Sequence, residues 1–478
     1  MKRLLIANRG EIARRIIRTA KRMGIETVAM YSDADTPSLH VREADQAFRL
    51  GGLSPRQTYL DIDRVMDIAR RSGADAVHPG YGFLSENPEF ARRCAEAGVT
   101  FIGPAAGAID LLGSKTAARR LAIESDVPVM PGTTDAITSI AEAKETAGRI
   151  GYPVLLKAAA GGGGKGMRVV ESPDKLEESY RMAQGEALTA FNSDEVFLEK
   201  YVIGPRHIEL QVVADHHGNV AVLGERECSI QRRHQKVIEE SPSVAVDDDL
   251  RERMFASAER LVRAAGYTNA GTLEFLLDAD GNFYFLEVNT RLQVEHPVTE
   301  MVTGLDLVEL QIRVASGETL PISTATVQRR GHAIECRICA EDVYSSFMPS
   351  IGTVRELHEP RGEHVRVDSS LYPGMPVTLY YDPMVAKLIV WGETRQKAID
   401  RTLEALGEYH IAGISTTIPF CAHVLRSREF REGRFSTSYV REHWNDPVQK
   451  LSPELLDLAA AAAVRTDERI REKIQGAV

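Results

Sequence analysis

The feature that most constrains this chain is a pair of apolar runs joined by a turn and followed by an alternating segment. The runs Leu273–Leu277 and Phe283–Leu286 flank the residues Asp-Ala-Asp-Gly-Asn, a pattern typical of a β-hairpin in which Glu274 would face Glu287. Beyond the second run, polar and apolar residues alternate, and in an extended chain every second side chain points to one face. We therefore expect one face of a long strand to carry a row of polar groups: Glu287, Asn289, Arg291, Gln293 and Glu295. The charge of Arg291 on this face would keep Glu295 ionised.

This row contains oxygen ligands suited to a hard cation. The carboxylates of Glu274 and Glu287 and the amide oxygen of Asn289 suit Mg²⁺, which keeps phosphate or water in its remaining positions. A half-buried edge strand with a solvated polar face would show the same alternation. The pattern alone leaves both interpretations open.

Composition limits the classes of protein to consider. At 478 residues the chain is expected to hold about two to four domains, and 43% hydrophobic with 26% charged residues is typical of a soluble globular protein. A net charge of −10 argues against nucleic acid as a main partner. Five scattered cysteines favour a reducing compartment. The apolar runs Leu4–Ala7 and Leu458–Val464 are too short for a signal-peptide core or a membrane span. We predict a cytoplasmic protein without a membrane partner.

Residues 1–113 show the rhythm of a doubly wound parallel sheet. Their first turn has no G-x-G-x-x-G motif, so a dinucleotide site is poorly supported. The segment His78–Asn87 follows a strand at its carboxyl end, where open α/β sheets bind ligands, although a plain connecting loop would look similar. The predicted strands are Leu4–Ala7, Thr27–Tyr31, Ala76–His78 and Thr100–Ile102, and the predicted helices are Glu11–Met23, Asp61–Ser72 and Pro88–Ala97.

A glycine-rich loop is the main feature of the next part. Lys115 lies in a basic helix that begins after Ser114, and a strand over 153–157 leads into Gly161–Gly166, where five of six residues are glycine. Such a run costs chain entropy, but it lets backbone N–H groups approach phosphate oxygens. It is not a Walker loop, since no Ser or Thr follows Lys165. A flexible linker is the alternative interpretation.

Two further strands and a cationic run precede the hairpin. The segments Phe197–Val202 and His207–Val213 are predicted strands, each with ionised residues among apolar ones. The run Cys228–Lys236 concentrates cationic and hydrogen-bonding groups. A solvated basic face is its alternative explanation.

Residues 331–445 are expected to form a mixed α+β part. It opens with a strand over His332–Ile338 and contains a helix over Arg395–Leu406. Cys336 and Cys339 lie three positions apart on that strand and would point to opposite faces, so we expect packing cysteines and not a metal or redox pair. The tail 446–478 is rich in alanine and charge and is predicted to be helical.

Motifs in all three parts resemble those of biotin carboxylase, the ATP-grasp component of acetyl-CoA, propionyl-CoA and pyruvate carboxylases. The resemblance implies an ATP-grasp architecture of the α/β and α+β classes. It also implies an N-terminal domain at 1–113, an ATP-grasp domain at 114–330 with a mobile lid at about 131–203, and a C-terminal domain at 331–445. The motifs are Asn8–Ala13, His78–Asn87, Lys115, Lys157 with its glycine loop, Cys228–Lys236, Glu287–His296 and His332–Arg337.

The resemblance also implies the substrates and their binding residues. ATP and Mg²⁺ (or Mn²⁺) would act with bicarbonate and with biotin on its carrier. Glu295 would be the general base, and Arg337 would stabilise the biotin enolate beside Tyr81. As a control for Glu295, we expect Glu300, past Pro297, to tolerate substitution by Gln far better. The ATP phosphates would bind Lys115, Lys157, Gly163 and Gly164. The adenine would contact Glu199 and Val202, and the nucleotide would also contact His207, Gln231 and His234. The metal would meet Glu274, Glu287 and Asn289, and bicarbonate would meet Lys236, Arg291, Gln293 and Val294.

The expected partners follow from what the sequence does not contain. Its only Met-Lys dipeptide, the usual site of biotin attachment, is Met1-Lys2. We expect a subunit, homodimeric by resemblance, that works with a biotin carboxyl carrier protein and a carboxyltransferase subunit. Cys339 and Ile351 depart from the family pattern and bear on subfamily more than on activity. The competing hypotheses are another ATP-grasp carboxylate–amine ligase and a non-catalytic nucleotide-binding subunit.

Overall fold

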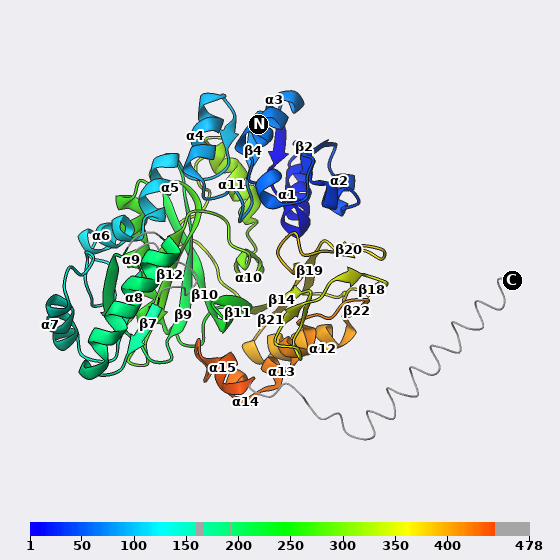
Figure 1. Cartoon of the computed structure of the whole chain (residues 1–478). Coiled ribbons are helices and arrows are strands. Elements are labelled where there is room, and N and C mark those ends of the chain that lie inside the picture. Colours follow the sequence, from blue (N-terminus) through cyan, green and yellow to red (C-terminus); the bar gives the residue numbers. More distant parts are fainter. Residues whose placement is uncertain (159–166, 192–193, 445–478) are drawn as a thin grey trace, which may run out of the picture.

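The computed structural model describes residues 1–158, 167–191 and 194–444 (Figure 1). The glycine loop at 161–166, including Gly163 and Gly164, and the tail at 446–478 lie outside the described residues. Among the described residues, no helix is both long and apolar enough to cross a membrane.

The N-terminal part is a parallel sheet with helices on both faces, as predicted. Its strand order is β3-β2-β1-β4-β5. Along β1, Leu4 and Ile6 pack with helix α1, whereas Leu5 packs with helices α3 and α4 on the other face, so alternate residues bury both sides of the strand. The elements are β1 (Arg3–Ile6), α1 (Gly10–Arg22), β2 (Glu26–Tyr31), α2 (Leu39–Glu43), β3 (Gln46–Arg49), α3 (Ile62–Ser72), β4 (Ala76–His78), α4 (Pro88–Glu96), β5 (Thr100–Phe101) and α5 (Ala106–Gly113).

An antiparallel sheet of eight strands forms the centre of the molecule. Its order is β13-β12-β9-β10-β11-β14-β21-β19. The predicted hairpin is confirmed, because β12 and β13 pair with Glu274 opposite Glu287. The strands are β9 (Arg206–Ala214), β10 (Val220–Arg232), β11 (Gln235–Ser241), β12 (Asn269–Leu277), β13 (Phe283–Asn289), β14 (His332–Cys339), β19 (Val365–Ser369) and β21 (Met384–Gly392).

The alternating run does not continue as a strand, and this prediction is wrong. Strand β13 ends at Asn289, and an irregular segment leads into helix α10 (His296–Thr303). Leu292 is fully buried in a cluster with residues of α11 (Leu307–Ala315). Pro297 lies in the first turn of α10, where its missing N–H has no cost. Burial of Leu292 and the start of a helix therefore draw the chain away from the sheet.

A separate lobe occupies the region predicted as a lid. Its sheet has the order β7-β6-β8, and its core contains Leu156, Tyr180 and Leu198. The helices α7 and α8 lie with β7 at one side of the molecule (Figure 1). The elements are α6 (Lys115–Glu124), which precedes the lobe, α7 (Ile140–Ile150), β6 (Val154–Ala158), β7 (Met167–Val170), α8 (Leu176–Phe191) and β8 (Val196–Lys200).

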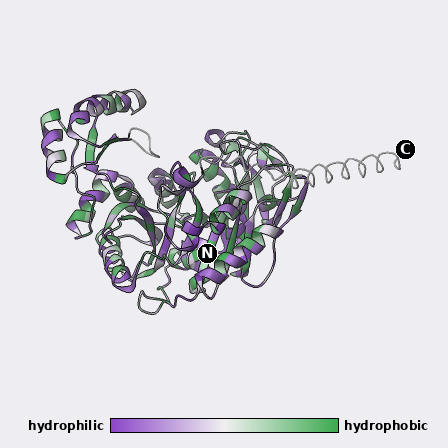
Figure 2. Ribbon diagram, turned by 90° about the horizontal axis from the view of Figure 1, so that it is seen from below, coloured by the Kyte–Doolittle hydropathy of each residue, from purple (hydrophilic) through white to green (hydrophobic). Residues whose placement is uncertain are grey.

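The C-terminal part extends the central sheet. Strand β14, predicted from sequence, pairs with β11 on one side and with β21 on the other. The central sheet therefore contains strands from both sides of the boundary expected at residues 330 and 331. Hydrophobic and hydrophilic residues intermix along the outer helices (Figure 2), as expected for helices with one buried face. Other elements are α9 (Asp248–Ala264), β15 (Glu341–Asp342), β16 (Met348–Pro349), β17 (Gly352–Thr353), β18 (Glu356–His358), β20 (Pro376–Val377), α12 (Arg395–Glu408), β22 (His410–Ala412), α13 (Ile418–Arg426), α14 (Arg428–Arg431) and α15 (Tyr439–His443).

Candidate active site

A cavity of about 1170 Å³ is lined by residues from all three parts of the chain. It brings together predicted residues that are far apart in sequence. Glu295 does not line the cavity, but its buried side chain binds two residues that do. The predicted residues in the lining are Tyr81, Lys115, Lys157, Glu199, Val202, His207, Gln231, His234, Lys236, Glu274, Glu287, Asn289, Arg291, Gln293, Val294 and Arg337.

The cationic run becomes a hairpin tip in the cavity wall. Strands β10 and β11 are joined by Arg233 and His234, both with positive φ values (49° and 67°). Positive φ at both central residues is the conformation that a tight two-residue hairpin turn needs, and it is uncommon for residues other than glycine. The turn lets Gln231 and Lys236 pair across the two strands beside the cavity. The run therefore forms part of the cavity wall, while Arg233 and His234 at its tip remain exposed.

Glu295 is fully buried and held between two cations. Its carboxylate accepts hydrogen bonds from Lys236 Nζ at 2.8 Å and from Arg337 Nη2 at 2.9 Å. Burial and the Glu209 carboxylate act to raise the pKa of Glu295, but Lys236 and Arg337 outweigh them and hold it below its ordinary value. Glu295 is therefore ionised at neutral pH.

Arg291, the cation predicted to lie beside Glu295, is bonded to other residues. Arg291 forms its ion pair with Glu86, at 2.8 Å, in the loop after β4. Its other nitrogens donate to Asn289 Oδ1 at 2.8 Å and to Gln293 Oε1 at 3.0 Å. Arg291 thus ties the predicted ligand loop at 78–87 to the metal and bicarbonate candidates. Arg291 interacts electrostatically with Glu295, but Lys236 and Arg337 contribute more to keeping Glu295 ionised, so Arg291 is not the main cation that was expected.

The three metal-ligand candidates lie together. Glu274 and Glu287 face each other across the hairpin, and Asn289 Nδ2 donates to Glu274 Oε1 at 2.9 Å. Burial and the charge of Glu274 raise the pKa of Glu287. A divalent cation would relieve this repulsion between two adjacent carboxylates, so the donor set fits Mg²⁺.

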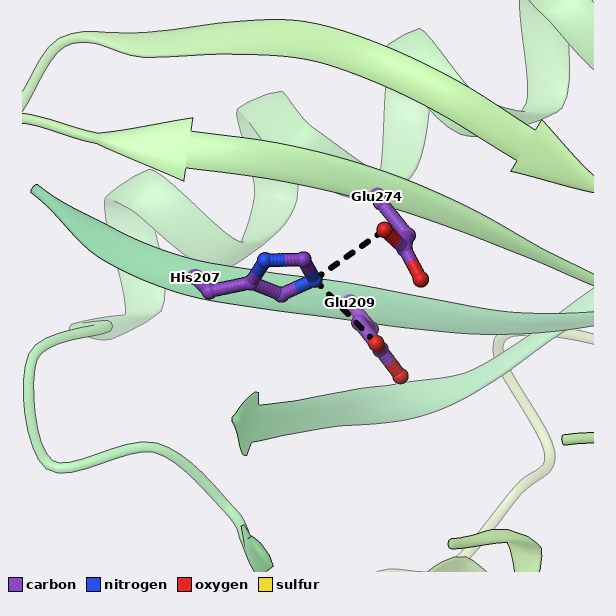
Figure 3. Close-up of side chains that lie close together, drawn as sticks. All are labelled: His207, Glu209 and Glu274. Atoms are coloured by element: carbon purple, nitrogen blue, oxygen red, sulfur yellow. Dashed lines mark hydrogen bonds and ion pairs between the residues drawn. The ribbon is translucent and has the colours of Figure 1, made fainter. Parts of the chain in front are cut away.

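A second acidic group around Glu274 does not fit a metal. The nearest donor atoms of His207, Glu209 and Glu274 lie within 4.8 Å of one another (Figure 3). His207 Nε2 lies 3.2 Å from an oxygen of each carboxylate. Burial acts to lower the pKa of His207, but the two carboxylates raise it to about 9. A protonated imidazole has no lone pair for a metal, so His207 serves here as a cation.

The lobe contributes a pair of ionised residues to the same cavity. Lys157 forms a salt bridge with Glu199 across β6 and β8. Arg119 Nη1 also lies 3.3 Å from a Glu199 oxygen. Glu199, predicted to contact adenine, is therefore paired with Arg119 and with Lys157, which is a predicted phosphate ligand.

Several buried charged residues next to the site were missed from the sequence. Arg226 is fully buried and binds Glu209, Gln211, Thr272 and Thr299. Glu239 accepts from Arg337 Nε at 2.5 Å. Lys387 is also fully buried. For Lys387 the available signal was a single ionised residue within an apolar strand, in the run Met384–Trp391.

The cysteines form no disulfide. All five are free, and Cys339 lines the cavity while Cys336 is buried beside Cys421. Burial raises the pKa of the Cys339 thiol well above its ordinary value. A buried protonated thiol is a poor nucleophile and a poor metal ligand.

Fold and site together define an ATP-grasp ligase. Residues 1–109 match the family model "Biotin carboxylase, N-terminal domain", 114–323 match "Carbamoyl-phosphate synthase L chain, ATP binding domain", and 335–442 match "Biotin carboxylase C-terminal domain". The chain belongs to the biotin carboxylase family, whose members are ATP-dependent ligases that carboxylate biotin.

Named relatives agree over nearly the whole chain. Biotin carboxylase 1 of Bacillus subtilis is 50% identical over 444 residues, which are 93% of this chain and 99% of that protein. The biotin carboxylase of Halalkalibacterium halodurans is 50% identical over 442 residues, which are 92% of this chain and 98% of that protein. The biotin carboxylase domain dimer of Hydrogenobacter thermophilus 2-oxoglutarate carboxylase, solved with MgADP, ADP and bicarbonate, has a TM-score of 0.87 at 47% identity, covering 92% and 97% of the two chains.

Proposed function

We propose that this chain uses ATP to activate bicarbonate as carboxyphosphate and transfers the carboxyl group to biotin on a separate carrier protein. The observation that carries the proposal is Glu295, an ionised carboxylate held between Lys236 and Arg337 directly behind the cavity wall. Bicarbonate is a poor electrophile, so its activation needs a base and cations placed together.

The nucleotide would lie between the lobe and the central sheet. Lys115 and Lys157, with Gly163 and Gly164, would neutralise the phosphates, and Glu199 and Val202 would meet the adenine. His207, Gln231 and His234 would complete the contacts. The solved relative that binds MgADP supports this assignment, as does the position of the described members in one cavity.

Glu274, Glu287 and Asn289 would hold Mg²⁺. Their two opposed carboxylates and one amide oxygen are hard ligands. When bound, the cation would neutralise charge on the phosphoryl oxygens. Mn²⁺ would suit the same ligands.

Glu295 would take the proton of bicarbonate as the bicarbonate oxygen attacks the terminal phosphorus of ATP, with ADP leaving. Lys236, Arg291, Gln293 and the backbone at Val294 would orient bicarbonate. A Glu295 carboxylate kept ionised by its neighbours is ready to accept that proton at neutral pH.

Arg337 would act on the second substrate. The ureido nitrogen of biotin is a very weak acid, so a cation at its developing enolate oxygen lowers the cost of removing the proton. The Arg337 guanidinium lines the cavity, and Tyr81 lies in the same lining. Phosphate released from carboxyphosphate would take that proton.

The partners follow from this reaction. A biotin carboxyl carrier protein would deliver biotin and a carboxyltransferase subunit would use the product, and the chain would form a homodimer in the cytoplasm. The dimeric relative supports the homodimer. The three matched segments support domains at 1–113, 114–330 and 331–445. The lobe with its own sheet and core supports a lid at about 131–203.

Phosphate release measured with ATP and bicarbonate, with and without free biotin, tests the proposal. We expect hydrolysis that requires bicarbonate and rises with biotin. Hydrolysis that requires an amine or amino acid would identify the rival carboxylate–amine ligase. ADP formation indifferent to both bicarbonate and biotin would contradict the proposal and favour a nucleotide-binding subunit.

A further inference from the structure

A buried lysine joins the three parts of the chain behind the cavity. Lys387 lies on β21, next to Arg337 of β14 in the register of the central sheet. Its side chain is fully buried, although it is charged. A buried lysine is rare unless its charge is paired and its N–H groups are bonded, so the partners of Lys387 define its role.

The contacts of Lys387 reach the N-terminal part of the chain and the segment before Glu295. Its Nζ lies 3.2 Å from Glu11 Oε1, at the start of α1. It donates at 2.7 Å to the backbone carbonyl of Val294. It also lies 5.8 Å from the centre of the Tyr81 ring, within cation–π range. Tyr81 donates its hydroxyl to the same Glu11 carboxylate.

These contacts end on both halves of the reaction. The carbonyl of Val294 belongs to the peptide that links Val294 to Glu295, so its orientation sets the direction from which the proposed base enters the site. Tyr81 is the residue proposed to lie beside biotin. Helix α10 is held separately, because Val298 and Val302 pack against Ala333 and Ile389. The apolar packing seats the helix, and Lys387 fixes the residues before it.

We propose that Lys387 is a positioning residue for carboxyl transfer to biotin, acting through Val294 and through the Glu11–Tyr81 pair. This inference rests on the proposed function. The ammonium holds the peptide before Glu295 and the Tyr81 ring in one arrangement relative to Arg337. Glu11, Val294 and Tyr81, the residues through which Lys387 acts, are not among the proposed nucleotide ligands, so we expect ATP binding to be independent of Lys387.

The test compares full-length Lys387→Met, Lys387→Arg and the control Arg395→Met in assays with free biotin. Arg395 is another largely buried cation near the same sheet, bound to Glu240 and to the carbonyls of Phe430 and Arg431, and it lies outside the cavity lining. We expect Lys387→Met to lower kcat/KM for biotin by about 100-fold, the cost of misplacing reacting groups by about 1 Å. KM for ATP should be unchanged, and Lys387→Arg should recover most of the loss.

Arg395→Met should lower the thermal midpoint yet keep the biotin kinetics of the folded protein. Folded Lys387→Met with wild-type biotin kinetics, or equal kinetic losses in Lys387→Met and Arg395→Met, would overturn the inference. If Lys387→Met does not fold, Glu11→Gln tests the inference instead, because this change keeps a hydrogen-bond acceptor but removes the charge. A raised KM for biotin in Glu11→Gln would support the inference, and an unchanged KM would overturn it. A wild-type chain that biotin does not stimulate would instead refute the proposed function.

Discussion

Two buried glutamates at helix α10 are each bound by two cations, but only one of them lies beside the cavity. Glu295, just before the helix, is bound by Lys236 and Arg337 beside the cavity. Glu300, inside the helix, is bound by Arg15 and Arg366, both at 2.7 Å, away from the cavity. Glu300 also accepts from the backbone N–H of Leu307 at 2.7 Å.

The difference lies in how the acids near each glutamate are paired. Around Glu300, burial acts to raise the pKa values of Asp306 and Asp368, but the arginines beside them outweigh it and hold both pKa values low. Near Glu295, Glu239 shares Arg337 with it, and burial and the Glu295 charge raise the pKa of Glu239 to about 7. Like charges forced together are typical of catalytic sites, whereas satisfied pairs stabilise the fold.

The largest expected effect is the loss of turnover in Glu295→Gln. The amide keeps the shape but cannot take a proton, so bicarbonate-dependent ATP cleavage should fall by ~10²–10⁴. KM for ATP should change little, because Glu295 lies outside the nucleotide contacts. Steady-state phosphate release checks this. Near-normal turnover would make Glu295 structural and remove the contrast with Glu300.

Glu300→Gln should show the opposite behaviour. The sequence alone suggested that this residue would tolerate substitution, but its burial between two arginines predicts a loss of about 2 kcal/mol in the free energy of unfolding. Turnover per folded molecule should remain close to wild type. Urea unfolding and phosphate release on the same sample measure both quantities. A fall in turnover as large as that of Glu295→Gln would show that both ends of α10 serve catalysis.

The regular elements could be predicted because their signals are local. Alternating apolar runs predicted the N-terminal sheet, and the turn residues between two such runs predicted the β12–β13 hairpin. The departure from β13 after Asn289 could not be predicted in this way. It depends on burial of Leu292 against α11, a contact made only in the folded chain.

The residues of the candidate site could also be predicted only where their signal was local. Residues in recognisable motifs, such as Lys236 and Arg337, were predicted. Lys387 and Glu239 were not, because their partners lie far away in sequence: 93 residues separate Lys387 from Val294, and 98 separate Arg337 from Glu239. Sequence periodicity shows that such a charge is buried but not which charge it meets.

The smallest expected effect is a change in pH dependence, and it separates the two ends of α10 without reference to activity. Glu239 has a folded-state pKa of about 7, above its ordinary value of 4.5, so the unfolded chain loses this proton first as the pH rises. The folded state is therefore destabilised progressively between about pH 4.5 and 7. Gln does not titrate, so Glu239→Gln should gain stability relative to wild type between pH 5 and pH 8 in urea unfolding. Asp368→Asn is the control from the Glu300 end: the pKa of Asp368 is lowered below 3.8, so its contribution is complete above that pH and its loss should be equal at pH 5 and pH 8. Equal pH trends in the two variants would mean that the acids at the cavity end are as well paired as those around Glu300.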